Sequence, residues 1–167
     1  MADIQQCIGY LASDDLSQQR SAAAQLLNAA GCDQAAVALT KAVGCDDELL
    51  VEGATGVLES IESITDDQVS LLAELLPGEN HQPHPNTGFW AATLLGRMGE
   101  RAAPSLGQLI AALDASTDEG VKQKIVWAIG KIGPKASEAC SHLRPLVDAS
   151  DKRLARLASQ ALESING

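Results

Sequence analysis

Aromatic residues are nearly absent from this sequence. Its 167 residues include one Phe, one Tyr and two Trp, against 27 Ala. Ala favours helices and disfavours strands, and the residues that usually fill sheets are too sparse here to build one. We therefore predict an all-α chain, with residues 1–167 forming a single domain whose core is made of small and branched aliphatic side chains.

Basic residues are also scarce: 12 Lys and Arg stand against 22 Asp and Glu, for a net charge of −10. Nucleic acids and anionic membranes both require clustered cations, so we exclude them as partners. No apolar run is long enough to span a bilayer, and the first residues lack the features of a signal peptide, so we expect a cytoplasmic protein.

Residues that carry catalysis or bind metals are few. The four Cys form no C-x-x-C pair, which indicates free thiols rather than a zinc site or a disulfide framework. There are three His, and the sequence has no G-x-S-x-G, P-loop or G-x-G-x-x-G motif. We therefore expect a protein without a cofactor and without enzymatic activity.

A nine-residue pattern recurs five times along the chain. The segment Ala-Ala-Thr-Leu-Leu-Gly-Arg-Met-Gly at 91–99 aligns without a gap with Ile-Val-Trp-Ala-Ile-Gly-Lys-Ile-Gly at 125–133, and further copies lie at 23–31, 54–62 and 158–166. The copies close at positions 31, 62, 99, 133 and 166, so the period is between 31 and 37 residues. Self-similarity at this period is typical of a repeat protein.

Each copy has the spacing of a first helix, and a second apolar helix follows four of the copies. We expect these second helices at about 33–43, 66–76, 102–113 and 136–148, and residues 3–12 have the pattern of a second helix belonging to a truncated first unit. One such pair cannot bury its own apolar stripe, so it becomes stable only against a neighbour. The sequence thus predicts an α-solenoid of about five helix pairs, or about ten helices.

The pattern Ala-Ala-x-x-Leu-Gly-x-x-Gly, with Pro104, Ser105 and Leu106 in the second helix, resembles the HEAT repeat. The short period resembles the bacterial HEAT-like subtype of phycobilisome bilin lyases. The resemblance implies a scaffold or protein-binding module, and leaves open an accessory lyase-like or chaperone protein acting on a chromophore-carrying protein. Basic residues that often open the first helix are limited to Arg20 and Lys122, so we do not expect a regular ladder of ion pairs between repeats.

The first candidate binding surface is an outer ridge that carries both tryptophans. Helical spacing places Trp90 and Trp127 near the side opposite the apolar stripe, in consecutive repeats that pack side by side. Exposed Trp beside cations is typical of a protein interface. The alternative is that packing between repeats covers one or both rings. The ridge comprises Trp90, Trp127, Arg97, Lys124 and Lys131.

The second candidate surface is acidic. Residues 1–80 hold 2 basic and 14 acidic groups, whereas residues 81–167 hold 10 basic and 8 acidic groups. Asp66, Asp67, Glu74 and Glu79 belong to or border a second helix, the kind that lines the concave side of HEAT-like stacks. We predict that this groove binds a partner with a basic segment, and the uneven charge also allows head-to-tail self-association.

Residues 77–88 are the irregular stretch of the chain, with three prolines and two glycines that exclude a helix. His81 and His84, with Glu79, are weak candidates for a divalent metal site. The alternative is a proline-stiffened loop with solvated histidines, and contact with another protein suits this loop better than metal binding.

Overall fold

The structure, a computed structural model, describes residues 3–167 and confirms the all-α repeat solenoid. Within that range the β-type pairing is a single isolated bridge between Gly78 and His81. The ten α-helices are α1 (Ile4–Leu11), α2 (Leu16–Leu26), α3 (Ala36–Ala42), α4 (Glu48–Ser60), α5 (Asp66–Ala73), α6 (Pro85–Met98), α7 (Leu106–Ala115), α8 (Glu119–Ile132), α9 (Cys140–Leu143) and α10 (Lys152–Asn166). Four 3-10 helices join them: η1 (Cys32–Ala35), η2 (Gly99–Ser105), η3 (Gly133–Ala139) and η4 (Arg144–Asp148).

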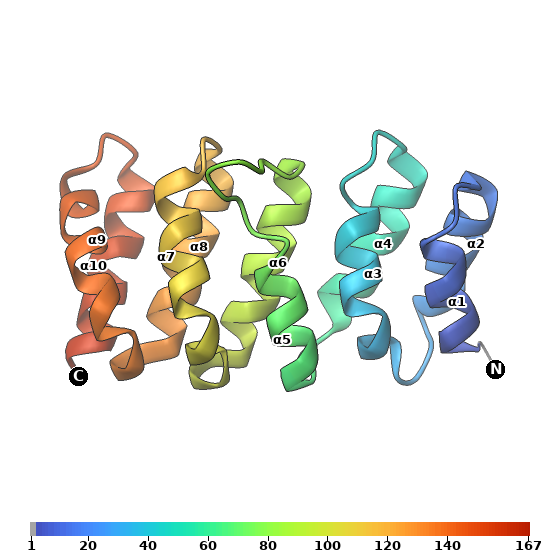
Figure 1. Cartoon of the computed structure of the whole chain (residues 1–167), viewed down its shortest axis with the longest axis horizontal. Helices are drawn as coiled ribbons and strands as arrows, with labels where there is room; N and C mark the ends of the chain where they lie inside the picture. Colours follow the sequence, from blue (N-terminus) through green and yellow to red (C-terminus); the bar gives the residue numbers. More distant parts are fainter. Residues whose placement is uncertain (1–2) are drawn as a thin grey trace.

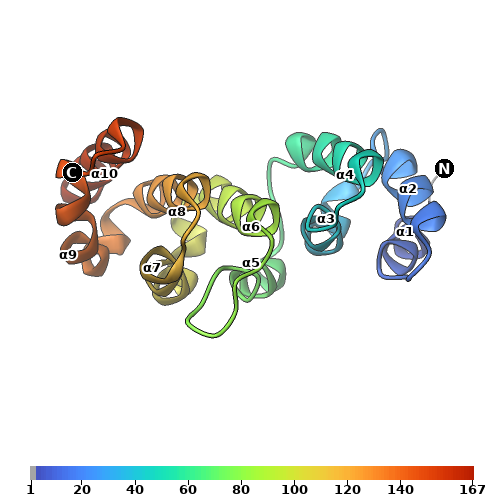
Figure 2. The same cartoon turned by 90° about the horizontal axis from the view of Figure 1, so that it is seen from above.

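The helices stand in one row with the chain termini at opposite ends (Figure 1). Seen from above, they form two layers (Figure 2). The first-helix layer contains α2, α4, α6, α8 and α10, and the second-helix layer contains α1, α3, α5, α7 and α9. Helix α1 thus occupies the place expected of the second helix of a truncated unit. None of the helices in the described part of the chain is long and apolar enough to cross a bilayer.

Each of the two best-matched copies contains two glycines, and the structure shows why a larger residue does not fit at these positions. A Cβ atom at Gly96 would overlap the six-membered ring of Trp127 and lie 3.1 Å from Ala128 Cα, and one at Gly130 would lie 3.0 Å from Ala161. The absent side chains let α6, α8 and α10 pack closely side by side. The closing glycines, Gly99 and Gly133, have φ values of 55° and 70°, which side chains disfavour.

The second helices differ from the expected continuous segments, because three of them begin with 3-10 turns. The segment expected at 136–148 is divided into η3, the four-residue α9 and η4. Pro145 has no amide hydrogen to donate within a helix, which accounts for the end of α9 just before it. Residues 77–88 also differ from the expectation, since α6 begins at Pro85, where a proline costs no hydrogen bond.

The row divides at the junction between α4 and α6. Helix α2 packs against α4, and α6, α8 and α10 pack against one another, whereas α4 and α6 scarcely meet. The two sides are connected by α3, which contacts both α5 and α6, and by hydrogen bonds across the junction. Arg97 Nη1 donates to the carbonyl oxygens of Leu58, at 2.7 Å, and Ile61, at 2.5 Å.

Polar contacts between successive first helices are irregular, as expected. Arg20 on α2 pairs with Asp47, which caps α4. In the C-terminal half the corresponding contact is made by Gln123, which donates to Asp151 at 2.6 Å. Lys122 instead pairs within its own helix, with Glu119 at 3.8 Å.

Candidate partner-binding surface

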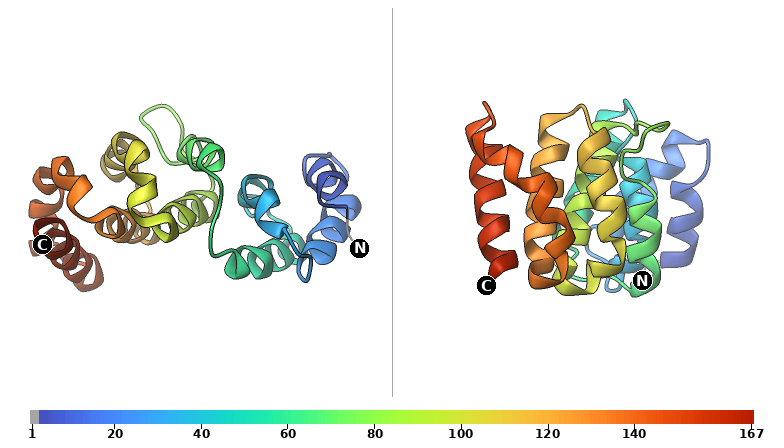
Figure 3. Two further views of the ribbon diagram at one scale, coloured as in Figure 1. Left: turned by 90° about the horizontal axis from the view of Figure 1, so that it is seen from below. Right: turned by 60° about the vertical axis from the view of Figure 1, so that its left-hand side comes forward.

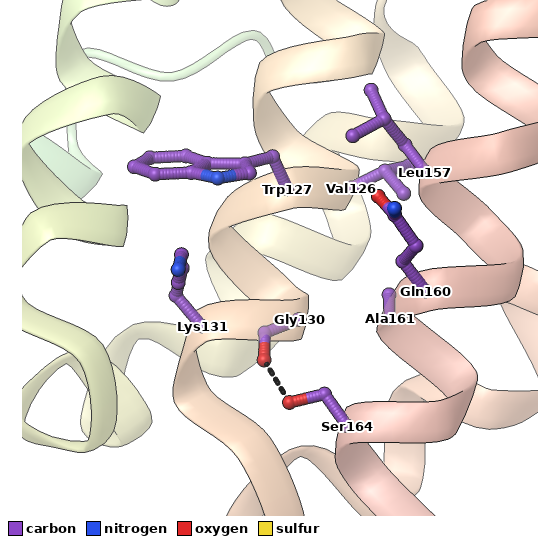
Figure 4. A pocket seen from close by; sticks show the side chains of 8 residues that line it. All are labelled: Val126, Trp127, Gly130, Lys131, Leu157, Gln160, Ala161 and Ser164. Carbon is purple, nitrogen blue, oxygen red and sulfur yellow. Dashed lines mark hydrogen bonds between the residues drawn. The ribbon is translucent and has the colours of Figure 1, made fainter.

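Trp127 lies at the centre of a surface on the first-helix layer. It projects from α8 toward α6 and is half-buried, because its ring rests in the space left by Gly96 (Figure 4). Its cationic neighbours come from the same helix: Lys124 Nζ lies 5.1 Å from the ring centroid and Lys131 Nζ lies 5.8 Å from it. Trp127 is therefore partly covered by packing between repeats, and the rest of its side chain is accessible beside two positive charges.

Lys124 occupies the space between two aromatic rings. Its Nζ atom is 4.9 Å from the centroid of Phe89 on α6, in addition to its contact with Trp127. Cation–π attraction holds the ammonium group there. Burial lowers the pKa of Lys124, and the nearby charges of Arg153 and Arg97 lower it further. Lys124 is thus a partly desolvated cation with two further cations, Arg153 and Arg97, near enough to affect its pKa.

Two hollows lie beside Trp127. The first, between α8 and α10, has a volume of about 250 Å³, and Figure 4 shows Leu157, Gln160 and Ser164 facing α8 across it. Ser164 Oγ donates to the carbonyl oxygen of Gly130 at 2.9 Å, which fixes the two helices beneath the hollow. The second hollow, of about 260 Å³, is lined by Phe89, Gly120, Gln123, Lys124, Trp127, Arg153 and Leu157.

Trp127 and Leu157 line both hollows, so the two form one continuous surface. We call it the Trp127 surface and define it by Phe89, Lys124, Trp127, Lys131, Arg153 and Leu157. Phe89, Arg153 and Leu157 were not among the residues expected from the sequence. The repeat alignment could have indicated Leu157. Lys124 and Leu157 occupy equivalent positions, because each lies nine residues before the closing position of its copy. Equivalent positions in stacked repeats lie side by side.

The prediction of an exposed ridge with both tryptophans is wrong for Trp90. Trp90 is only 8% exposed and packs edge-on against Phe89, with ring centroids 5.8 Å apart. The prediction treated α6 as covered on one side only. Because α6 lies inside the row and contacts α3, α5 and α8, ten of its fourteen residues are buried.

Arg97 also differs from its expected role in the ridge. It is half-buried, lies 5.8 Å over the Trp90 ring and donates to the carbonyl oxygens at the end of α4. Its guanidinium group is therefore used in joining α6 to α4. Arg97 belongs to the internal structure of the stack, while Lys124 and Lys131 remain on the surface.

The four acidic candidates do not form one cluster. Asp66 and Asp67 lie in the first turn of α5 and Glu74 is its C-cap, so the eight-residue helix separates them by about 12 Å. Asp66 is paired with Arg101 at 2.6 Å, and both line a hollow of about 350 Å³. Glu79 lies in the loop that follows. All four carboxylates are exposed, but they present separate charges rather than a single acidic site.

The loop of residues 77–84 stands out from the second-helix layer beside α5 and α7 (Figure 3, left). Gln82 fixes it by donating from Nε2 to the carbonyl oxygens of Gly78, at 3.1 Å, and Ala115, at 3.0 Å. His84 caps α6, its Nδ1 accepting from the Asn86 amide at 3.2 Å, while His81 is exposed. A search of residues 3–167 finds no group of three or more His, Cys, Asp or Glu placed to hold a metal ion.

Comparison with known proteins agrees with the fold. A family model described as HEAT repeats matches residues 80–163, half of the chain. A crystal structure of computationally designed armadillo repeat proteins for modular peptide recognition is similar over 98% of this chain and 82% of that one, with 19% identity and a TM-score of 0.62. An engineered protein is similar over 100% of both chains, with 19% identity and a TM-score of 0.49. No curated protein matches the sequence.

Proposed function

Because this chain belongs to the HEAT repeat family, we propose that it is a protein-binding module and that it binds its partner through the Trp127 surface. Its role is to present a rigid surface, without catalysis. The observation that carries the proposal is the half-buried Trp127 that lines two hollows, with Lys124 and Lys131 close to its ring. Large aromatic side chains beside cations supply most of the binding energy in many interfaces.

Rigidity supports the same proposal. Helices α6, α8 and α10 are closely packed, and Gly96 and Gly130 bring their backbones together. A surface held in this way loses little conformational entropy on binding, so more of the contact energy appears as affinity. The acidic residues of α5 support binding less well, because they are dispersed and one is already paired.

The direct test is affinity capture from extracts of the cell that makes the protein. Wild type is compared with Trp127→Ala, with Lys131→Glu, which changes an exposed side chain, and with the control Leu49→Ala. Leu49 lies on α4 and is 62% exposed, so it is an apolar surface residue far from Trp127. We expect a stoichiometric partner with wild type and the control, and its loss with Trp127→Ala and Lys131→Glu.

Capture of no partner by wild type, or equal capture by all variants, contradicts the proposal. The purified protein also tests the alternative suggested by the sequence, an accessory role on a bilin-carrying protein. Added bilin is expected to leave the absorption spectrum unchanged, whereas a shifted band on binding supports that other role.

A further inference from the structure

The cations of the Trp127 surface lack carboxylate partners. Within residues 3–167, ion pairs link Arg20, Arg101, Lys122 and Lys135 to acidic side chains, but no carboxylate oxygen lies within 4 Å of Lys124, Lys131 or Arg153. Lys124, Lys131 and Arg153 differ from the other cations outside these ion pairs because they lie together on one surface around Trp127. Asp151 forms no ion pair with Arg153, although the charge of Arg153 helps to lower the pKa of Asp151.

Lys124 gains most from an incoming anion. Its ammonium group is partly removed from water by Phe89 and Trp127, and Arg153 lines the same hollow. Burial lowers the pKa of Lys124 and the charges of Arg153 and Arg97 lower it further, so the charged ammonium group has lost hydration and is repelled by two cations. A carboxylate placed in this hollow offsets both the lost hydration and the mutual repulsion of the cations.

The apolar residues of the Trp127 surface indicate which side chains the ligand carries beside its acidic group. Leu157 and Trp127 offer apolar contacts in both hollows, and Phe89 adds one in the second. A ligand that fills both hollows therefore carries an aliphatic or aromatic side chain close to its acidic group. The two hollows share Trp127 and Leu157, so together they suit an extended segment rather than a single small anion.

On this basis we propose that the Trp127 surface binds an acidic, partly apolar segment of the partner protein, with a carboxylate seated between Lys124 and Arg153. This inference rests on the proposed function and specifies its partner. It reverses the expectation from the sequence, in which the partner contributes a basic segment. The acidic half of the chain, residues 1–80, repels such a segment and so directs it to the C-terminal half.

The test uses a displayed library of random peptides selected on the full-length protein. We expect the selected peptides to be enriched in Asp and Glu next to Leu, Ile or an aromatic residue. The strongest binder is then synthesised, together with a version in which Asp and Glu become Asn and Gln. The neutral version is expected to bind at least tenfold more weakly.

Matched protein variants locate the site. The double variant Lys124→Gln with Arg153→Gln is expected to weaken binding of the acidic peptide by about 10- to 100-fold. The control is Lys152→Gln with Arg144→Gln, which changes the net charge equally at exposed residues that line neither hollow. The control is expected to bind within about twofold of wild type, since long-range charge is screened by salt.

A selection without binders, peptides without acidic enrichment, or equal weakening in both double variants overturns the inference. Self-association that is lost in the Lys124 and Arg153 variant identifies a second copy as the occupant and also overturns it. Capture of a partner through Trp127, combined with selected peptides that lack carboxylates, leaves the proposed function in place while this inference fails.

Discussion

At the scale of single residues, Gly96 and Trp127 act as a pair. The indole ring fills the space where a side chain on α6 would otherwise be, and the same glycine brings α6 close to Ala128 on α8. This contact holds the ring in one orientation while leaving its other parts accessible to the two hollows. A glycine in the middle of a helix normally destabilises it, so its presence here reflects close packing rather than helix propensity.

Replacing Gly96 by Ala is expected to lower the free energy of unfolding by about 1–3 kcal/mol, because the new methyl group overlaps the Trp127 ring. Urea denaturation monitored by circular dichroism measures the change. The control is Gly107→Ala on α7, where nothing lies within 4 Å of an added Cβ. That substitution is expected to stabilise the protein by about 0.5–1 kcal/mol through helix propensity. A Gly96→Ala protein as stable as wild type contradicts this description of the contact.

At the scale of helices, the junction between α4 and α6 is the weakest point of direct packing in the first-helix layer. Arg97 compensates by donating to the carbonyl oxygens of Leu58 and Ile61 at the end of α4. The Leu58 oxygen also accepts from the Ile61 amide at 3.3 Å, and the carbonyl oxygens of a last helical turn lack the usual helical donors. Met98 and Arg101 add contacts to Ile64. The junction between α4 and α6 is thus held by hydrogen bonds between side chains and backbone groups rather than by direct packing of the two helices.

Replacing Arg97 by Leu is expected to loosen the N-terminal side of the junction. Two partly buried carbonyl oxygens lose a charged donor, a loss of about 1–3 kcal/mol. Hydrogen–deuterium exchange is expected to show faster exchange in α3 and α4 and little change in α8 and α10. The control, Arg144→Leu, removes an exposed arginine of η4. Uniform acceleration along the whole chain contradicts the assignment of Arg97 to the junction.

The helix pairs were predictable from the sequence because each repeat corresponds to one pair, which recurs at the same period as the packing between neighbours. Each closing glycine marks where the chain must turn, and the helices of the first layer end at or within a few residues of these positions. The 3-10 turns were not predictable in the same way, since they depend on how sharply the chain must return to the next layer. The start of α6 at Pro85 differs from the prediction because three prolines and two glycines within residues 77–88 together argue against a helix, although a single proline is compatible with the first helical position.

The candidate site was predictable in part. Lys124, Trp127 and Lys131 share one face of α8, which helical spacing alone reveals. The burial of Trp90 depends on neighbours contributed by other repeats, and a single-helix argument does not include them. Phe89 and Arg153 join the surface only through the packing of α6 and α10 against α8, so no spacing within α8 points to them.

At the scale of the whole molecule, charge and packing divide the chain in the same way. Residues 1–80 have 12 more acidic than basic groups and residues 81–167 have 2 more basic than acidic groups. The C-terminal half contains the closely packed helices, the Trp127 surface and most of the match to the HEAT repeat model. An acidic ligand is therefore repelled by one end of the row and attracted by the other.

The chain contains two tryptophans, so the indole signals in a proton–nitrogen correlation spectrum report on the surface directly. The measurement is a titration of isotope-labelled protein with the strongest acidic peptide from the selection, with the signals assigned using Trp127→Phe. We predict that the Trp127 indole signal shifts as the peptide saturates, while the signal of the buried Trp90 moves much less. Binding that shifts Trp90 more than Trp127, or that leaves both signals in place, contradicts the assignment of the binding site to the Trp127 surface.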